Sequence, residues 1–313
     1  MNRFYRIPAA VVLVLFIFVA SRALIHALPG DPLETLLAET GTHLSRELLR
    51  ADLKLDEPFF VGTWHQFLAA LHGDWGSSLL TRRPIGPVLL TRSLNTFLLS
   101  LTTLLIALSA ALTLAFFSIC RFDFRGGESL RRVVDRLCTF QSVIAAALPT
   151  PWLAPILGYV LAVRFPIFPL GNHLALPAIT LSIPFSGLWA RLLRDRIRET
   201  LGVFGETSGP AQAARGRGIA EWKVILKYGL APASGSLLAY LGTQLGALMA
   251  GAFVTEIVFD WEGVGSLLVE SVLKRDYPIV EAAVFITATA AVLGTFLGDW
   301  MQWKVDPRLR EQG

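Results

Sequence analysis

Four long stretches of this sequence contain no aspartate, glutamate, lysine or arginine, and each is 26 to 28 residues long. A helix needs about 20 residues to cross the hydrocarbon core of a bilayer. Each stretch is therefore long enough to form one membrane-spanning helix. The four stretches are 93–120, 137–163, 165–190 and 228–255.

Two further apolar stretches raise the expected number of spans to six. The first, 7–28, is interrupted only by Arg22, whose long side chain we expect to snorkel toward the outer membrane surface. It also has features of a signal peptide, but its apolar character continues past the small residues at 20–23, so we expect it to be retained. The second, 277–303, has an uncharged core at 282–298.

The composition supports this interpretation. Charged residues make up 17% of the chain and hydrophobic residues 53%, with a mean hydropathy of +0.55. Because soluble domains carry about 25% charged residues, a soluble two-domain enzyme, a secreted disulfide scaffold and a disordered chain are excluded. We expect an all-α membrane protein with six transmembrane helices. Cys120 and Cys138 fall at predicted cytoplasmic ends of spans, where thiols stay reduced.

The basic residues predict the orientation of the spans. With a cytoplasmic N-terminus, 18 of the 28 lysines and arginines fall in inside segments, as the positive-inside rule requires. Both termini are therefore expected to be cytoplasmic, and the pI near 9.3 indicates membrane orientation rather than nucleic-acid binding. The predicted organisation is a first transmembrane helix at 1–29, an external helical segment at 30–92, a transmembrane core at 93–303 that includes a cytoplasmic loop at 195–229, and a cytoplasmic tail at 304–313.

The cytoplasmic loop has a distinctive pattern of small residues. Proline at 210 follows Ser208 and Gly209, which favours a helix start, because a first-turn proline loses no hydrogen bond. The segment 210–215 predicts a short helix with small side chains, which Gly216 and Gly218 end. A second amphipathic helix is predicted at 220–228.

Several motifs resemble one family in sequence order. Gln212, Ala213 and Ala214, followed by Gly218, match the Glu-Ala-Ala-x-x-x-Gly pattern of the inner-membrane permease subunits of ABC importers. The resemblance extends over about 5–310 and is to the B-type subunit of the dipeptide, oligopeptide and nickel branch. The further motifs are ALPGDP (27–32), LKLDEP (53–58), GDWGSS (73–78), LPAITL (176–181), ARGRG (214–218), WEGVG (261–265), RDYP (275–278) and DPR (306–308).

This resemblance implies a type I ABC importer permease with six transmembrane helices and an external helical subdomain between the first two. Such a chain forms half of a translocation path for di- or oligopeptides in a bacterial or archaeal cytoplasmic membrane, in contact with membrane lipid. The implied partners are a second homologous permease subunit, two ATP-binding cassette subunits and an extracytoplasmic solute-binding protein. Nickel or metal-chelate uptake is the alternative within the same family.

The resemblance also implies that the cytoplasmic loop couples the spans to an ATPase. The short helix would dock on one ATPase subunit, with a polar contact from Gln212, close packing by Ala213 and Ala214, and a backbone turn at Gly218. Glutamine at 212 replaces the usual acid, and Glu262 replaces a usual proline. The implied coupling residues are Gln212, Ala213, Ala214, Arg215 and Gly218.

The chain carries no ATPase motif of its own. It has no Gly-x-x-x-x-Gly-Lys-Ser/Thr sequence, and the dipeptide Gly-Lys does not occur. We therefore expect it to be no enzyme, to have no catalytic residues and to bind no cofactor, and we expect the partner ATPase subunits to use ATP and Mg.

Polar residues inside predicted spans are the candidates for the substrate path, because burying them in a bilayer is costly. They are Thr243, Gln244, Glu256 and Asp299. Glu256 has a second interpretation, the stabilisation of an outer re-entrant stretch at 257–278. The glycines of the last two spans are expected to serve helix packing.

Two other classes of function have little support in the sequence. A self-contained secondary transporter would be expected to show an internal repeat, which we do not find, and a membrane hydrolase would need a catalytic group that we do not find. The five histidines motivate nickel only faintly, since none of their spacings predicts a metal site.

Overall fold

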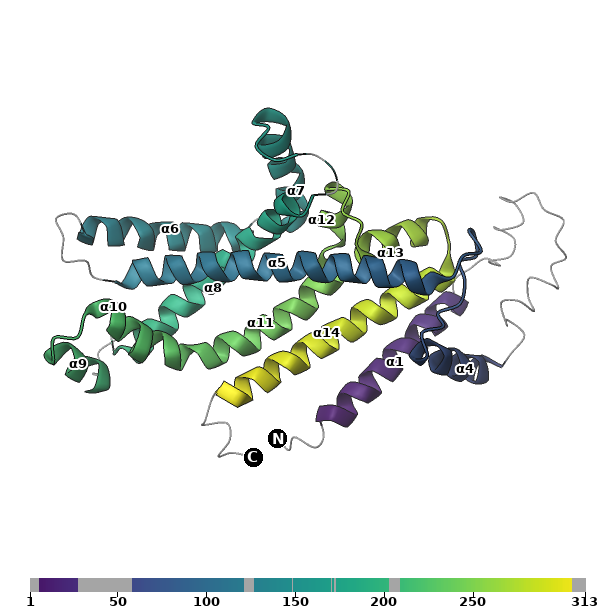
Figure 1. Ribbon diagram of the computed structural model, residues 1–313, viewed down its shortest axis with the longest axis horizontal. Coiled ribbons are helices and arrows are strands. Elements are labelled where there is room, and N and C mark those ends of the chain that lie inside the picture. The colour runs from purple at the N-terminus through teal and green to yellow at the C-terminus, as the bar shows by residue number, and fades with distance from the viewer. Residues whose placement is uncertain are drawn as a thin grey trace. The chain divides into compact units, whose positions relative to one another are not determined.

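The computed structural model describes residues 6–27, 58–120, 127–147, 149–169, 171, 173–202 and 209–305 (Figure 1). The regular structure of these residues is helical, with one isolated antiparallel pair between Ser77 and Pro84. Much of the expected external helical segment at 30–92, the motifs at 27–32, 53–58 and 306–308, and the C-terminal tail beyond 305 lie wholly or partly outside the described residues.

The expected all-α membrane protein is confirmed. Three described helices are long and apolar enough to cross a bilayer, namely Ile85–Ile119, Ala175–Thr200 and Tyr277–Lys304. The other three predicted spans coincide with a shorter apolar helix at Pro8–Ala23, with the helical segment around 137–163 and with the helix Ala231–Gly251.

The chain forms two compact units, and three long helices run from one unit into the other. Unit 1 comprises Met1–Phe97, Met249–Phe253 and Glu262–Val292, and unit 2 comprises Leu98–Leu248, Val254–Trp261 and Leu293–Gly313. The shared helices are α5 (Ile85–Ile119), α11 (Ala231–Gly251) and α14 (Tyr277–Val305).

Unit 1 is held together by aromatic and aliphatic contacts. Phe18 lies 5.1 Å from Phe285 and 5.3 Å from Phe67, measured between ring centroids. A second cluster packs Ile85 and Leu89 of α5 against Val264 and Leu267. The other helices of this unit are α1 (Arg6–Ala27), α4 (Phe59–Leu71) and α13 (Val264–Leu273).

Arg22 lies in unit 1 and does not extend to the surface, contrary to what the sequence led us to expect. It is only 8% exposed, and its Nη1 lies 3.6 Å from Oε1 of Glu281 in α14. Gln66 of α4 donates a hydrogen bond of 3.3 Å to the other carboxylate oxygen. An acidic partner inside the fold therefore takes the place of solvent.

Unit 2 contains the loop that is predicted to be cytoplasmic and a break in one predicted span. The stretch 137–163 is not one continuous helix, because the backbone at Pro149 is extended, with ψ 137°, and a new helix begins at Thr150.

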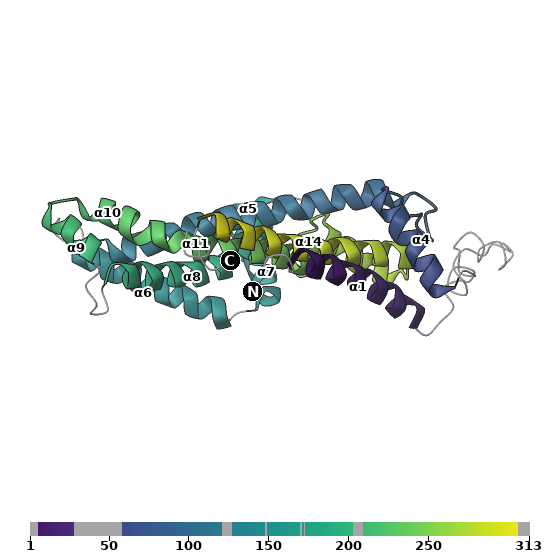
Figure 2. The ribbon, with the colours of Figure 1, turned by 90° about the horizontal axis from the view of Figure 1, so that it is seen from below.

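Both ribbon views place α9 and α10 at one end of this unit, beyond the ends of α8 and α11 (Figure 1, Figure 2). Its remaining elements are α6 (Gly127–Ala147), α7 (Thr150–Gly158), the π-helical segment η2 (Tyr159–Arg164), α8 (Ala175–Thr200), α9 (Gly209–Gly216), α10 (Glu221–Val224), the π-helical segment η3 (Ile225–Leu230) and α12 (Phe253–Val258).

Candidate functional site at helix α9

Helix α9 ends in the way that its glycine pattern predicts. Gly218 has φ +71°, a conformation that residues with a Cβ rarely adopt. Its N–H donates to the carbonyl of Arg215 over 2.9 Å, and the N–H of Ile219 donates to Ala214 over 3.2 Å. These two bonds form a Schellman motif, which reverses the chain sharply after a helix. The turn predicted at Gly218 is confirmed.

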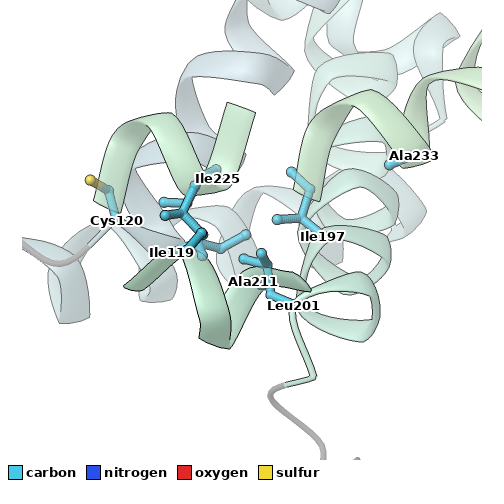
Figure 3. Packing of buried hydrophobic residues seen from close by; sticks show 9 residues of the cluster. Ile119, Cys120, Ile197, Leu201, Ala211, Ile225 and Ala233 are labelled. Carbon is cyan, nitrogen blue, oxygen red and sulfur yellow. The ribbon is translucent and has the colours of Figure 1, made fainter. Parts of the chain in front are cut away.

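One face of α9 packs inside the chain. Ala211 and Ala214 are 1% and 0% exposed, and they belong to a hydrophobic cluster to which six elements contribute (Figure 3). Because both side chains are methyl groups, the helix lies close to its neighbours. The other buried members are Ile119, Cys120, Ile197, Leu201, Val224, Ile225 and Ala233.

The opposite face of α9 is open. Gln212 and Ala213 are both exposed, so they are available to another protein. Ala214, expected from the resemblance to pack against a partner, instead packs within its own chain. The sequence pattern did not distinguish the two alanines, because a short helix of small residues has no apolar stripe that marks its inner face.

The C-terminal end of α9 is tied to α10 by an ion pair. The guanidinium of Arg215 donates to both carboxylate oxygens of Glu221, over 3.0 and 2.8 Å. This hydrogen bonding raises the pKa of Arg215 above its ordinary value, while partial burial opposes the rise. Glu221 was not singled out in the sequence, although its spacing of six residues across a glycine turn permits such a pair.

The chain after α10 lies close to α8. A methyl group added to Gly229 of η3 would come within 2.7 Å of Cγ2 of Ile197, so glycine permits this approach. The Thr200 hydroxyl lies 3.3 Å from the carbonyl oxygen of Gly229. Helix α8 therefore packs against the segment that leads into α11, and its C-terminal end shares the hydrophobic cluster with α9.

The candidates for the substrate path lie on three helices. In α11, Thr243 is exposed and Gln244 is half-buried, and Asp299 in α14 is half-buried. Glu256 in α12 is 0% exposed, and its backbone carbonyl accepts a hydrogen bond of 2.8 Å from the N–H of Trp261. The burial of this side chain agrees with the second interpretation of Glu256, the stabilisation of the stretch at 257–278, whereas the backbone hydrogen bond would form with any residue at this position.

The histidines of the described ranges do not support a metal site. No group of three or more histidine, cysteine, aspartate or glutamate side chains in those ranges is arranged to hold a metal ion. Nδ1 of His72 lies 2.8 Å from the carbonyl oxygen of Leu68, one turn earlier in the chain. His43 and the side chain of His26 lie outside the described residues.

Comparison with known proteins gives one consistent result. Residues 124–311 match the family described as the binding-protein-dependent transport system inner membrane component. The chain is 29% identical over 309 residues to the glutathione transport system permease protein GsiC of Salmonella typhimurium, covering 97% of this chain and 95% of the relative. It is 30% identical over 291 residues to GsiC of Escherichia coli K12, covering 91% of each.

Proposed function

Because the chain belongs to the family of binding-protein-dependent transport system inner membrane components and is an ABC importer permease subunit, we propose that it conducts peptides. The observation that supports this substrate class is the likeness, over nearly the whole chain, to permeases named for glutathione, which is a tripeptide. The chain forms half of the translocation path, and a solute-binding protein delivers di- or oligopeptides to it.

The energy for transport comes from partners. The chain contains no P-loop, so two ATP-binding cassette subunits bind and hydrolyse ATP with Mg. A second homologous permease subunit supplies the other half of the path. The protein lies in the cytoplasmic membrane with both termini and α9 on the cytoplasmic side, in agreement with its basic residues.

Helix α9 is the coupling helix in this proposal. Its buried face fixes it to α5, α8 and η3, and its open face leaves Gln212 and Ala213 free to enter a groove on an ATPase subunit. Closure of the ATPase pair on ATP then moves α9 together with the helix ends behind it as a rigid body. Arg215 and Gly218 hold the shape of the turn.

The path for the substrate includes polar groups of α11 and α14. Thr243 is exposed and Gln244 and Asp299 are half-buried, so these side chains are available to a hydrated peptide. Glu256 serves the fold of the α12 turn rather than the path, since its side chain is shielded from solvent.

A pair of glycine variants tests the coupling role. Gly218→Val places a β-branched residue at φ +71°, whereas Gly216→Ala adds a methyl group where no atom lies within 4 Å. The importer carrying Gly218→Val is expected to assemble but to lose substrate-stimulated ATPase activity, and Gly216→Ala is expected to retain it. Normal stimulation in an assembled Gly218→Val complex would contradict the coupling role.

The substrate class is tested by uptake in cells that lack this subunit. Labelled dipeptides, glutathione and nickel are supplied separately, and uptake is compared with cells in which the subunit is restored. Peptide or glutathione uptake is expected to fall, and nickel uptake is expected to remain. Loss of nickel uptake alone would overturn the peptide proposal.

A further inference from the structure

Helices α6 and α8 approach each other closely along a polar seam. A methyl group added to Gly187 of α8 would lie 2.8 Å from the backbone oxygen of Gln141, so the two backbones nearly touch. The hydroxyl of Ser142 lies 2.7 Å from the carbonyl oxygen of Gly187, and the amide of Gln141 donates to Ser186 over 2.6 Å. These contacts fix the two helices at one point.

Toward the C-terminal end of α8, a single carboxylate of α6 holds two arginines. Oδ1 of Asp135 accepts hydrogen bonds of 3.0 Å from Nη1 of Arg194 and of 3.0 Å from Nη2 of Arg198. The Arg194 side chain is 10% exposed and also donates to the Thr139 hydroxyl over 3.1 Å. A partly desolvated pair of this kind is stronger than an exposed one, because water screens it less.

The C-terminal end of α8 also belongs to the hydrophobic cluster that contains α9. Ile197 and Leu201 pack in the cluster that contains Ala211 and Ala214, while Arg194 and Arg198 contact α6. Residues four apart lie on the same side of a helix, so the end of α8 presents Arg194 and Arg198 to α6, and Ile197 and Leu201 to the cluster that contains α9. A displacement of α9 therefore reaches the part of α8 that Asp135 holds.

We propose that Asp135 is a positioning residue for energy coupling, which locks α6 to the end of α8 so that a displacement of α9 moves both helices together. This inference rests on the coupling role proposed for α9. Without the carboxylate, α8 would still follow α9, but α6 would lag behind, and ATP hydrolysis would drive transport less efficiently. Coupling of two sites requires a physical element whose position both of them bias, and the linked pair of helices is that element.

The test uses the complete importer in proteoliposomes and measures peptide imported per ATP hydrolysed. Asp135→Asn is expected to lower this ratio by about fivefold, the lower end of the usual range of coupling effects. Asp135→Glu keeps the charge and is expected to restore much of the ratio. Glu199→Gln is the matched control, since Glu199 forms an ion pair with Arg196 of the same helix at 3.1 Å. If Asp135→Asn fails to assemble, Arg198→Gln removes one of the two donors instead.

A distance measurement separates positioning from general stability. Spin labels at the exposed sites Arg136→Cys on α6 and Arg191→Cys on α8 report the separation of the helices, with Cys120 and Cys138 replaced by alanine. Their distance is expected to stay constant on ATP binding when Asp135 is present and to change in Asp135→Asn. An unchanged distance and an unchanged transport ratio in Asp135→Asn would overturn the proposal.

The outcomes also separate this inference from the proposed function. If the unaltered importer shows no ATP-driven peptide uptake, the substrate proposal fails, and the spin-label distance still tests the link between α6 and α8. If Gly218→Val leaves stimulation intact, the coupling role of α9 fails. If the other two results are as expected but the Asp135 variants match the unaltered protein in transport ratio and spin-label distance, only the role proposed for Asp135 is wrong.

Discussion

The hydroxyl of Ser78 donates a hydrogen bond of 2.5 Å to the carboxylate of Asp276, which lies 198 residues further along the chain. The other oxygen of Asp276 accepts the backbone N–H of Leu79 over 3.1 Å. Asp276 is 3% exposed, so it clamps the loop before α5 to the start of α14 from inside the fold.

Removing this clamp is expected to open the loop before α5. Asp276→Ala leaves two buried donors without their acceptor, and a hydrogen bond to a charged group contributes about 1.5–3 kcal/mol. Trypsin should then cleave faster after Arg82, which is exposed in the same loop. Asp74→Asn is the control, because the carboxylate of Asp74 accepts a local hydrogen bond from the N–H of Gly76 in an exposed turn. Equal cleavage rates for the Asp276 and Asp74 variants would count against the clamp.

Local patterns in the sequence predicted the helices and the turn at Gly218, but not the pairs between distant helices. Uncharged length is sufficient to predict a span, and a glycine after a helix is sufficient to predict a chain reversal. Asp276 with Ser78, and Asp135 with Arg194, are brought together only by the folded arrangement of helices. No periodicity within one helix indicates which partner a charged side chain will find.

The glycines of α11 and α14 are expected to tolerate no added side chain. A methyl group on Gly242 would overlap the backbone of Gly298 and lie 2.7 Å from the carbonyl oxygen of Gly294, which confirms the packing role expected for these glycines. Gly242→Ala should lower the free energy of unfolding by about 1–3 kcal/mol, the usual cost of overpacking. Thermal unfolding in detergent measures the loss. Ala247→Leu on the exposed side of α11 is the control and should have little effect.

Arg22 and Glu281 are expected to be more costly to replace singly than together. Both are less than a tenth exposed, so Arg22→Met leaves a buried carboxylate without its cation, which costs about 3–5 kcal/mol. The double variant Arg22→Met with Glu281→Leu removes both charges and should regain much of this loss. The thermal midpoints of the two single variants and the double variant give the comparison. A double variant no more stable than either single one would show that the charges do not depend on each other.

The ion pair between Arg215 and Glu221 is expected to fix the orientation of the α9 turn and to contribute little to the free energy of unfolding. The Arg215 side chain is 38% exposed, and solvent screening limits such a pair to less than about 1 kcal/mol. Arg215→Lys cannot contact both oxygens in the same way, so it should reduce substrate-stimulated ATPase activity while barely changing the thermal midpoint. A large fall in the midpoint with normal stimulation would reverse this assignment.

The same pair also predicts a flat response to alkaline pH. The hydrogen bond to Glu221 raises the pKa of Arg215 in the folded protein. A base whose pKa is raised by folding contributes its full stabilisation below its ordinary pKa, and the contribution is lost only as the pH rises through the raised value. Because the ordinary pKa of arginine lies far above neutral pH, the stability difference between the unaltered protein and Arg215→Ala should be constant from about pH 7 to 9. Thermal unfolding of both proteins at each pH measures this difference. If the difference shrinks between about pH 7 and 9, a group other than Arg215 governs the stability of the α9 turn.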